Sequence, residues 1–215
     1  NGAWLLIKAS ANGTLDAPNP ISLVSGTYNA GATVLEFNGD GCADLLANAG
    51  SGWTVYVSNC TGGIASNYSV SGINSSVLPL DMNGDGLDDL VFAGGRDVYI
   101  KDNLGGSFAA ARQSISDVED LSWASRSPRQ RADFDGDGRE DLLGFRPVSN
   151  STSFHLMAYR SNPSRDFSAG TVITTIPGQG RGTVSGVDVN GDGLTDVVYF
   201  NGSTWRVHLG VGGTV

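Results

Sequence analysis

The sequence predicts an all-β fold: a β-propeller of four-stranded antiparallel blades, with about four blades in this chain. A nine-residue acidic motif occurs four times, and its copies begin at Glu36, Asp81, Asp133 and Asp188, which are 45, 52 and 55 residues apart. An alternating run led by an aromatic residue, such as Trp53-Thr-Val-Tyr-Val, recurs in step with the motif. The remaining segments show no helical periodicity and are typical of short strands.

One repeat is expected to hold four strands, a to d, in chain order. Short apolar segments flank the motif, for example Val34-Leu35 before it and Leu45-Leu46 after it. A small polar turn at 48–52 leads into the aromatic run, and the glycine turn Gly62-Gly-Ile64 leads into the last strand. The motif therefore lies at the a–b corner of an antiparallel meander. A β-sandwich is the rival fold, but it gives no reason for four copies of one loop.

The chain is expected to form a single propeller over residues 1–215. The predicted units are a partial blade over 1–30 and blades over about 31–72, 73–115, 128–178 and 182–215. The chain begins at a strand c and stops at Gly213-Thr-Val215, the start of a strand d. We interpret it as a piece of a larger ring. A compact four-bladed ring closed by pairing the two ends is the alternative.

The four motifs predict up to four Ca²⁺ sites. Positions 1, 3, 5 and 9 carry side-chain oxygens and position 7 can offer its carbonyl, which suits a cation that takes six to eight oxygen ligands. Glycines at positions 4 and 6 allow the tight turn. The predicted ligands are Glu36, Asn38, Asp40, Cys42, Asp44, Asp81, Asn83, Asp85, Leu87, Asp89, Asp133, Asp135, Asp137, Arg139, Asp141, Asp188, Asn190, Asp192, Leu194 and Asp196.

The predicted sites differ in strength. The third loop has four carboxylates and should bind most tightly, whereas the first opens with the longer Glu36 and should bind most weakly. The loops are not EF-hands, because position 12 lacks the bidentate Glu and the flanks are expected to be strands. Polar Asp/Asn-Gly turns that bind no metal are the alternative, which four copies of the carboxylates at positions 5 and 9 disfavour.

The composition excludes some classes of partner. The chain has 13 Lys and Arg against 22 Asp and Glu, a formal net charge of −9, which disfavours nucleic acid as a partner. Thirteen of the acids are predicted metal ligands, so the negative charge is concentrated in the four loops. No apolar run is long enough to span a membrane. The chain opens at Asn1 without Met, which we interpret as a processed or excised product.

The four Asp-x-(Asp/Asn)-Gly-Asp-Gly-x-x-Asp loops, with their intervening strands, resemble the FG-GAP/VCBS repeat family over nearly all of the chain. This family includes the calcium-loop propellers of integrin alpha chains, certain fungal lectins and secreted bacterial proteins. The segment from Ala132 to Leu143 is most similar to the propellers of bacterial Rhs-type and Tc toxin proteins. The resemblance implies a calcium-binding propeller in a secreted, extracellular or cell-surface protein.

Cys42 and Cys60 lie symmetrically about Ser51, the middle of the predicted b–c hairpin. They should face each other across its open end, where a cross-strand disulfide is feasible and would suit an exported protein. Two separately buried thiols are the alternative.

No catalytic or organic-cofactor site is predicted. The only histidines, His155 and His208, are expected on half-exposed strand faces, and the usual nucleophile and phosphate motifs are absent. Trp4, Trp53 and Trp205 could stack on sugars but are expected to pack between blades. Trp123 is the better candidate for an exposed contact, and the cluster Arg126, Arg129 and Arg131 is interpreted as a solvated loop.

The main hypothesis is a non-enzymatic, calcium-stabilised propeller that acts as a binding or scaffold module of an exported protein of the Rhs or Tc toxin type. Its expected partners are a protein or glycan ligand and the rest of a larger propeller, with no nucleic acid and no membrane span. A carbohydrate-binding lectin is the first alternative, and a polysaccharide lyase built on a propeller is the second.

Overall fold

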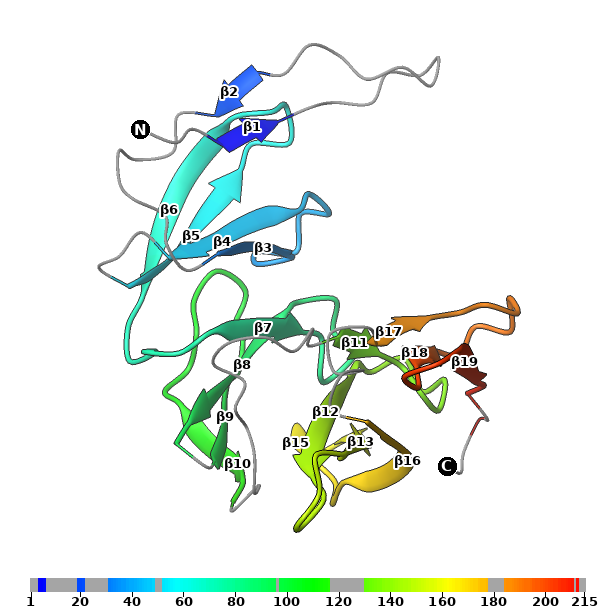
Figure 1. Ribbon diagram of the computed structural model, residues 1–215. Helices are drawn as coiled ribbons and strands as arrows, with labels where there is room; N and C mark the ends of the chain where they lie inside the picture. Colours follow the sequence, from blue (N-terminus) through cyan, green and yellow to red (C-terminus); the bar gives the residue numbers. More distant parts are fainter. Residues whose placement is uncertain are drawn as a thin grey trace.

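The computed structural model describes residues 4–6, 19–21, 31–48, 52–95, 97–116, 130–177, 184–210 and 212. Within these ranges every regular element is a β-strand, and no helix that could cross a membrane is found. The strands form four main antiparallel sheets that follow one another along an arc in chain order (Figure 1). The predicted all-β propeller is confirmed.

Each main sheet is a run of neighbouring strands, and their bounds are as follows. The first sheet contains β3 (Ala32–Leu35), β4 (Asp44–Asn48), β5 (Trp53–Ser58) and β6 (Ile64–Val70). The second contains β7 (Val77–Leu80), β8 (Asp89–Gly94), β9 (Asp97–Lys101) and β10 (Arg112–Ile115). The third contains β11 (Gln130–Ala132), β12 (Asp141–Pro147), β13 (Phe154–Tyr159) and β16 (Thr171–Ile176). The last contains β17 (Val184–Val187), β18 (Asp196–Phe200) and β19 (Trp205–His208).

Two short pairs lie outside the main sheets. β1 (Trp4–Leu6) pairs with β2 (Asn19–Ile21), and β14 (Ser161–Asn162) pairs with β15 (Asp166–Phe167). The second pair is inserted between β13 and β16 and was not predicted from the sequence. The predicted strand d at 213–215, Trp123, Arg126 and Arg129 lie outside the described residues.

The register places each acidic motif at the corner between the first and second strands of its sheet. Position 9 of the motif is the first residue of the second strand, where it pairs with the last residue of the first strand, as in Leu35 with Asp44 and Leu80 with Asp89. The motifs thus become four equivalent loops, named the first (36–44), second (81–89), third (133–141) and fourth loop (188–196).

The core consists of apolar layers between consecutive sheets. We call the face that a sheet turns to the next sheet in the chain its leading face, and the opposite one its trailing face. Leu46, Trp53 and Val55 on the leading face of the first sheet cluster with Leu90 and Phe92 of the second. Two further clusters join the second sheet to the third and the third to the last, and a small one that contains Ala47 and Tyr56 lies on the trailing face of the first sheet. Because alternate strand residues point to opposite faces, each inner sheet contributes to two layers.

Candidate metal centre and neighbouring sites

The loops share one hydrogen-bonding plan that begins with the carboxylate at position 1. In the second loop Asp81 accepts the amides of Gly84 and Gly86, both at 2.8 Å. The same two bonds occur in the third and fourth loops. In the first loop Glu36 accepts only the amide of Gly39, at 2.8 Å. These amide donors, that of Gly193 first, lower the pKa of Asp188, so this exposed carboxylate is charged at neutral pH.

Positions 3 and 5 complete the turn. In the first, second and fourth loops the Asn at position 3 donates its Nδ2 to the Asp at position 5, at 2.9 Å. The same Asp accepts the amide of position 7 at 2.9 Å in every loop. The side chains at positions 3 and 5 thus fix the turn through hydrogen bonds within the loop, and they carry the oxygen atoms that a cation such as Ca²⁺ prefers as ligands.

The carboxylate at position 9 is buried and connects the loop to its sheet. Asp141 accepts the amides of Phe134 at 3.0 Å and Ser161 at 2.8 Å, and Asp44 and Asp196 make equivalent pairs of bonds. Burial raises the pKa of Asp141 to about 6 and that of Asp89 to about 7. These carboxylates therefore have a structural role whether or not they also contact a cation.

Each loop is also joined to the next by a pair of hydrogen bonds, which we call the interloop clamp. The N–H of Glu36 donates to the Asp88 carboxylate at 2.7 Å, and the N–H of Asp88 donates to the Glu36 carbonyl at 2.8 Å. Asp81 and Glu140 form the same pair, as do Asp133 and Thr195, whose side-chain acceptor is a hydroxyl. The clamp always links position 1 of one loop to position 8 of the next.

Two glycines show how closely the loops approach one another. A Cβ on Gly84 would lie 3.2 Å from the Gly138 carbonyl of the third loop, and one on Gly136 would lie 2.7 Å from Leu194 of the fourth. Both have positive φ, at 72° and 75°. Glycine at position 4 therefore serves both the turn and the contact between loops.

The third loop has the clearest geometry for a cation. Asp133, Asp135 and Asp141 each place a carboxylate oxygen within 4.8 Å of the others. Asp135 Oδ1 is buried and has no hydrogen-bond partner among the described residues. A buried carboxylate oxygen that lacks a donor is costly unless a cation contacts it. These three residues therefore fit a hard divalent cation, to which they would supply oxygen ligands.

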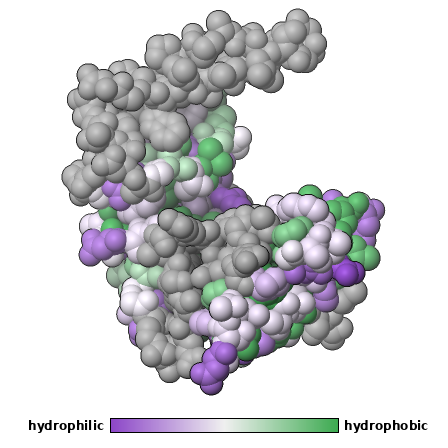
Figure 2. Space-filling view, viewed as in Figure 1, coloured by the Kyte–Doolittle hydropathy of each residue, from purple (hydrophilic) through white to green (hydrophobic). Residues whose placement is uncertain are grey.

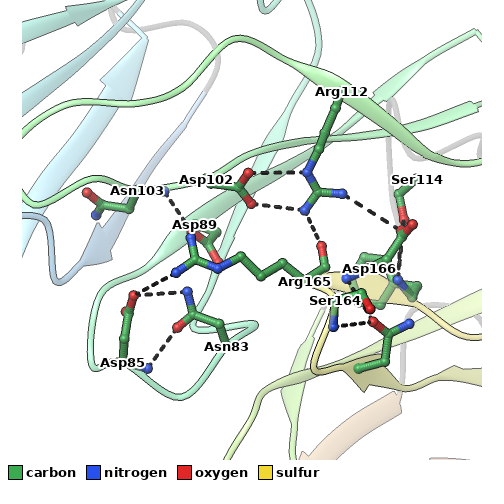
Figure 3. Close-up of polar contacts among 12 residues, drawn as sticks. Asn83, Asp85, Asp89, Asp102, Asn103, Arg112, Ser114, Ser164, Arg165 and Asp166 are labelled. Atoms are coloured by element: carbon green, nitrogen blue, oxygen red, sulfur yellow. Dashed lines mark hydrogen bonds and ion pairs between the residues drawn. The ribbon is translucent and has the colours of Figure 1, made fainter.

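Arginine side chains approach two of the loops, and these contacts were not predicted from the sequence. Arg165, in the turn between β14 and β15, lies 3.7 Å from Asp85 in the second loop (Figure 3). In the third loop Arg139 pairs with Asp137, and Arg160 lies 3.8 Å from Asp135. These cations offset part of the carboxylate repulsion. The repeat pattern does not mark Arg160 and Arg165, because both belong to the irregular region after β13.

The remaining residues singled out from the sequence lie in several places. Cys42 and Cys60 form a disulfide with a Cα–Cα distance of 5.5 Å, which confirms the first of the two alternatives. Arg131 does not belong to a solvated loop. It lies in β11 and pairs with Asp88 at 2.8 Å and Glu140 at 3.6 Å. His155 Nδ1 lies 2.9 Å from Thr175 Oγ1, and His208 is exposed in β19.

A pocket of about 520 Å³ lies between the second and third sheets. Its wall on the third sheet includes Arg146, His155, Met157 and Tyr159, and Ile115 lines it from the second sheet. Register places His155 beside Arg146 on the trailing face of the third sheet. The guanidinium of Arg146 forms no ion pair within the described ranges. Burial raises the pKa of Tyr159, so its hydroxyl is protonated at neutral pH.

Three four-stranded sheets and a last one with three described strands, each with an acidic, clamped loop at its a–b corner, define a β-propeller of the repeat type. Residues 81–144 and 133–199 match the FG-GAP-like repeat family, and together these matches span more than half of the sequence. The chain belongs to this family.

Two solved structures share the fold. A lectin of Agrocybe aegerita, described as specific for non-reducing terminal N-acetylglucosamine, is 22% identical with a TM-score of 0.68. The alignment covers 87% of this chain and 51% of the lectin. The Tc holotoxin pore of Photorhabdus luminescens is 18% identical with a TM-score of 0.62, over 96% of this chain and 10% of the toxin chain. No curated protein sequence matches significantly.

Proposed function

We propose that the chain is a non-enzymatic, calcium-stabilised binding module of an exported protein of the Tc or Rhs toxin type. The observation that carries the proposal is the row of clamped acidic loops, in which Asp133, Asp135 and Asp141 converge in the third loop. Calcium suits this donor set because it takes many oxygen ligands and tolerates irregular geometry, whereas Mg²⁺ requires a near-ideal octahedron. The similarity to the toxin supports the proposal at the level of the fold.

The cation would act on stability, because the loops connect the sheets. Each loop is joined to its own sheet by the position 9 carboxylate and to its neighbour by the interloop clamp. A bound ion would therefore hold adjacent sheets in register and stabilise the folded state by mass action. Calorimetric titration of chelated protein with CaCl₂ and then MgCl₂ tests this. Heat from CaCl₂ with a higher unfolding temperature is expected, and no response to calcium would refute it.

Lectin activity is a second candidate, favoured by the pocket between the second and third sheets. At the corresponding place in the second sheet, Phe92 and Tyr99 stack with ring centroids 5.8 Å apart. In the third sheet the paired residues there are Gly144 and Met157, and a Cβ on Gly144 would lie 3.2 Å from the ring of Tyr159, which lines the pocket together with Met157. A pocket of this volume, with an apolar wall and a few polar groups, suits one or two sugar rings.

A glycan array that includes neutral and carboxylated sugars tests this candidate. Arg146→Gln should abolish binding to carboxylated sugars, because it removes the cation that lacks an ion pair in the described structure. Arg206→Gln is the matched control, since Arg206 is an exposed residue of β19, far along the chain from the pocket. Binding to no glycan at all would remove the lectin candidate and leave the scaffold role. Cleavage of polyuronides would contradict the non-enzymatic proposal.

A further inference from the structure

The leading face of the last sheet is exposed, although its counterparts are buried. Trp53 and Val55 on the leading face of the first sheet are 4% and 0% exposed, and Leu156 on that of the third is 0% exposed. On the last sheet the corresponding Trp205 and Val207 are 63% and 52% exposed. Val187, Val189 and Leu209 extend this apolar surface. Figure 2 shows green atoms among white and purple ones over the region of β17–β19.

The fourth loop also presents the backbone groups for a second interloop clamp, in addition to its clamp with the third loop. Position 1 of each of the first three loops donates its N–H to position 8 of the next loop and accepts an N–H in return. In the fourth loop the N–H and carbonyl of Asp188 have no partner in the part of the chain that the structure describes. This polar feature is independent of the apolar face, and in the other three loops the same groups bind the loop of the sheet against which the leading face packs.

We propose that the leading face of the last sheet binds a further FG-GAP-like sheet that carries its own acidic loop. The partner loop has Asp, Glu or Thr at position 8, whose side-chain oxygen accepts the Asp188 N–H and whose N–H donates to the Asp188 carbonyl. The trailing face of the partner is apolar, like that of the second sheet with Leu90 and Phe92. The proposal extends an interface that the molecule already repeats three times, and it is independent of metal and ligand.

Two other occupants fit poorly. The first sheet of a second copy of this chain would present Ala43 at position 8, and alanine has no side-chain oxygen to accept the Asp188 N–H. The pair β1–β2 cannot supply the clamp either, because residues 1–30 contain no acidic motif. Within this chain, position 8 has a side-chain oxygen in the second, third and fourth loops, each of which follows another acidic loop. The first loop, which follows none, has alanine there.

The test appends a copy of residues 73–115, which carries Asp88 at position 8, after Val215. The copy contains no tryptophan and therefore adds none to the emission. The emission of Trp205 is obtained by subtracting the spectrum of the same fusion protein with Trp205→Phe. Docking should shift this emission to the blue and reduce its quenching by acrylamide several-fold. Asp88→Ala within the copy should restore much of the quenching, because one clamp bond is lost.

A second fusion, with a copy of residues 128–178 and its Glu140, covers the case in which the first copy does not fold. Trp205 that stays fully quenchable in both fusions would overturn the proposal. Trp205 that becomes protected in the unfused protein as its concentration rises would also overturn it, because that result assigns the face to a second copy of the chain.

Discussion

The first and third loops share one backbone plan but are held in place by different means. In the first loop a disulfide joins position 7 to Cys60 beyond the end of β5, and Glu36 accepts a single loop amide. In the third loop Asp133 accepts two amides, clamps lead to both neighbouring loops, and three carboxylates converge. The first loop depends on a covalent bond where the third depends on charge and hydrogen bonds.

This difference follows from their places in the row of loops. The third loop lies between two others and is supported from both sides. The first has Ala43 at position 8 and no described partner upstream, so its only clamp is the one to Asp88. The disulfide therefore lies in a loop that, among the described residues, is clamped to one neighbour and not to two. Four changes should test this contrast, in decreasing order of expected effect.

The largest effect is expected from the buried carboxylate of the third loop. Asp141→Asn places an amide nitrogen against the backbone N–H donors of Phe134 or Ser161 and should cost about 3–5 kcal/mol of unfolding free energy. Asp44→Asn should cost about 1–2 kcal/mol less, because the disulfide still holds the first loop beside β5. Urea unfolding of both variants measures the difference. Equal losses would show that the disulfide does not support the loop.

Removal of the disulfide should come next. The Cys42→Ser and Cys60→Ser double variant opens a link between residues separated by 18 positions, and it should lose about 3 kcal/mol. In this variant Asp44→Asn should become as costly as Asp141→Asn. Hydrogen exchange should show the loss of protection mainly in β4 and β5. An equal loss in β12 and β13 would contradict the local role.

The sequence alone was sufficient for the fold, because the repeat encodes it four times. The motif spacing and the aromatic runs located the a–b corners and strand c, and Cys42 and Cys60 could be related through the hairpin about Ser51. The β14–β15 pair was missed because it occurs in one sheet only. A pattern that depends on repetition cannot reveal an element that is not repeated.

The candidate site was predictable in composition but not in its connections. Positions 1, 3, 5 and 9 were identified from residue type and spacing, whereas the clamp was missed because Asp88, Glu140 and Thr195 share no residue type. What they share is a side-chain oxygen in the place where the preceding loop presents an N–H. The arginine contacts were missed for a related reason, since Arg165 reaches Asp85 across 80 positions of the chain.

Chelation should have the third-largest effect. Calcium at 100 times its dissociation constant should stabilise the protein by about 2.7 kcal/mol, and EDTA should remove this increment. Asp135→Asn should weaken calcium binding in the third loop, because it removes one of the converging carboxylates. Asn38→Asp, which gives the first loop a fourth carboxylate, should strengthen binding there. Calorimetry of the two variants gives opposite changes if charge governs affinity, and unchanged affinities would refute that view.

The smallest effect concerns the clamp. Glu140→Ala removes the acceptor of the Asp81 N–H and the ion pair with Arg131, and it should cost about 1–2 kcal/mol. Ala43→Asp supplies the missing oxygen to the first loop, but no described position 1 lies upstream to donate to it. Its effect should therefore stay within about 0.5 kcal/mol. A stabilisation by Ala43→Asp as large as the loss in Glu140→Ala would mean that the first loop already has an upstream donor. The contrast between a supported third loop and a terminal first loop would then fail.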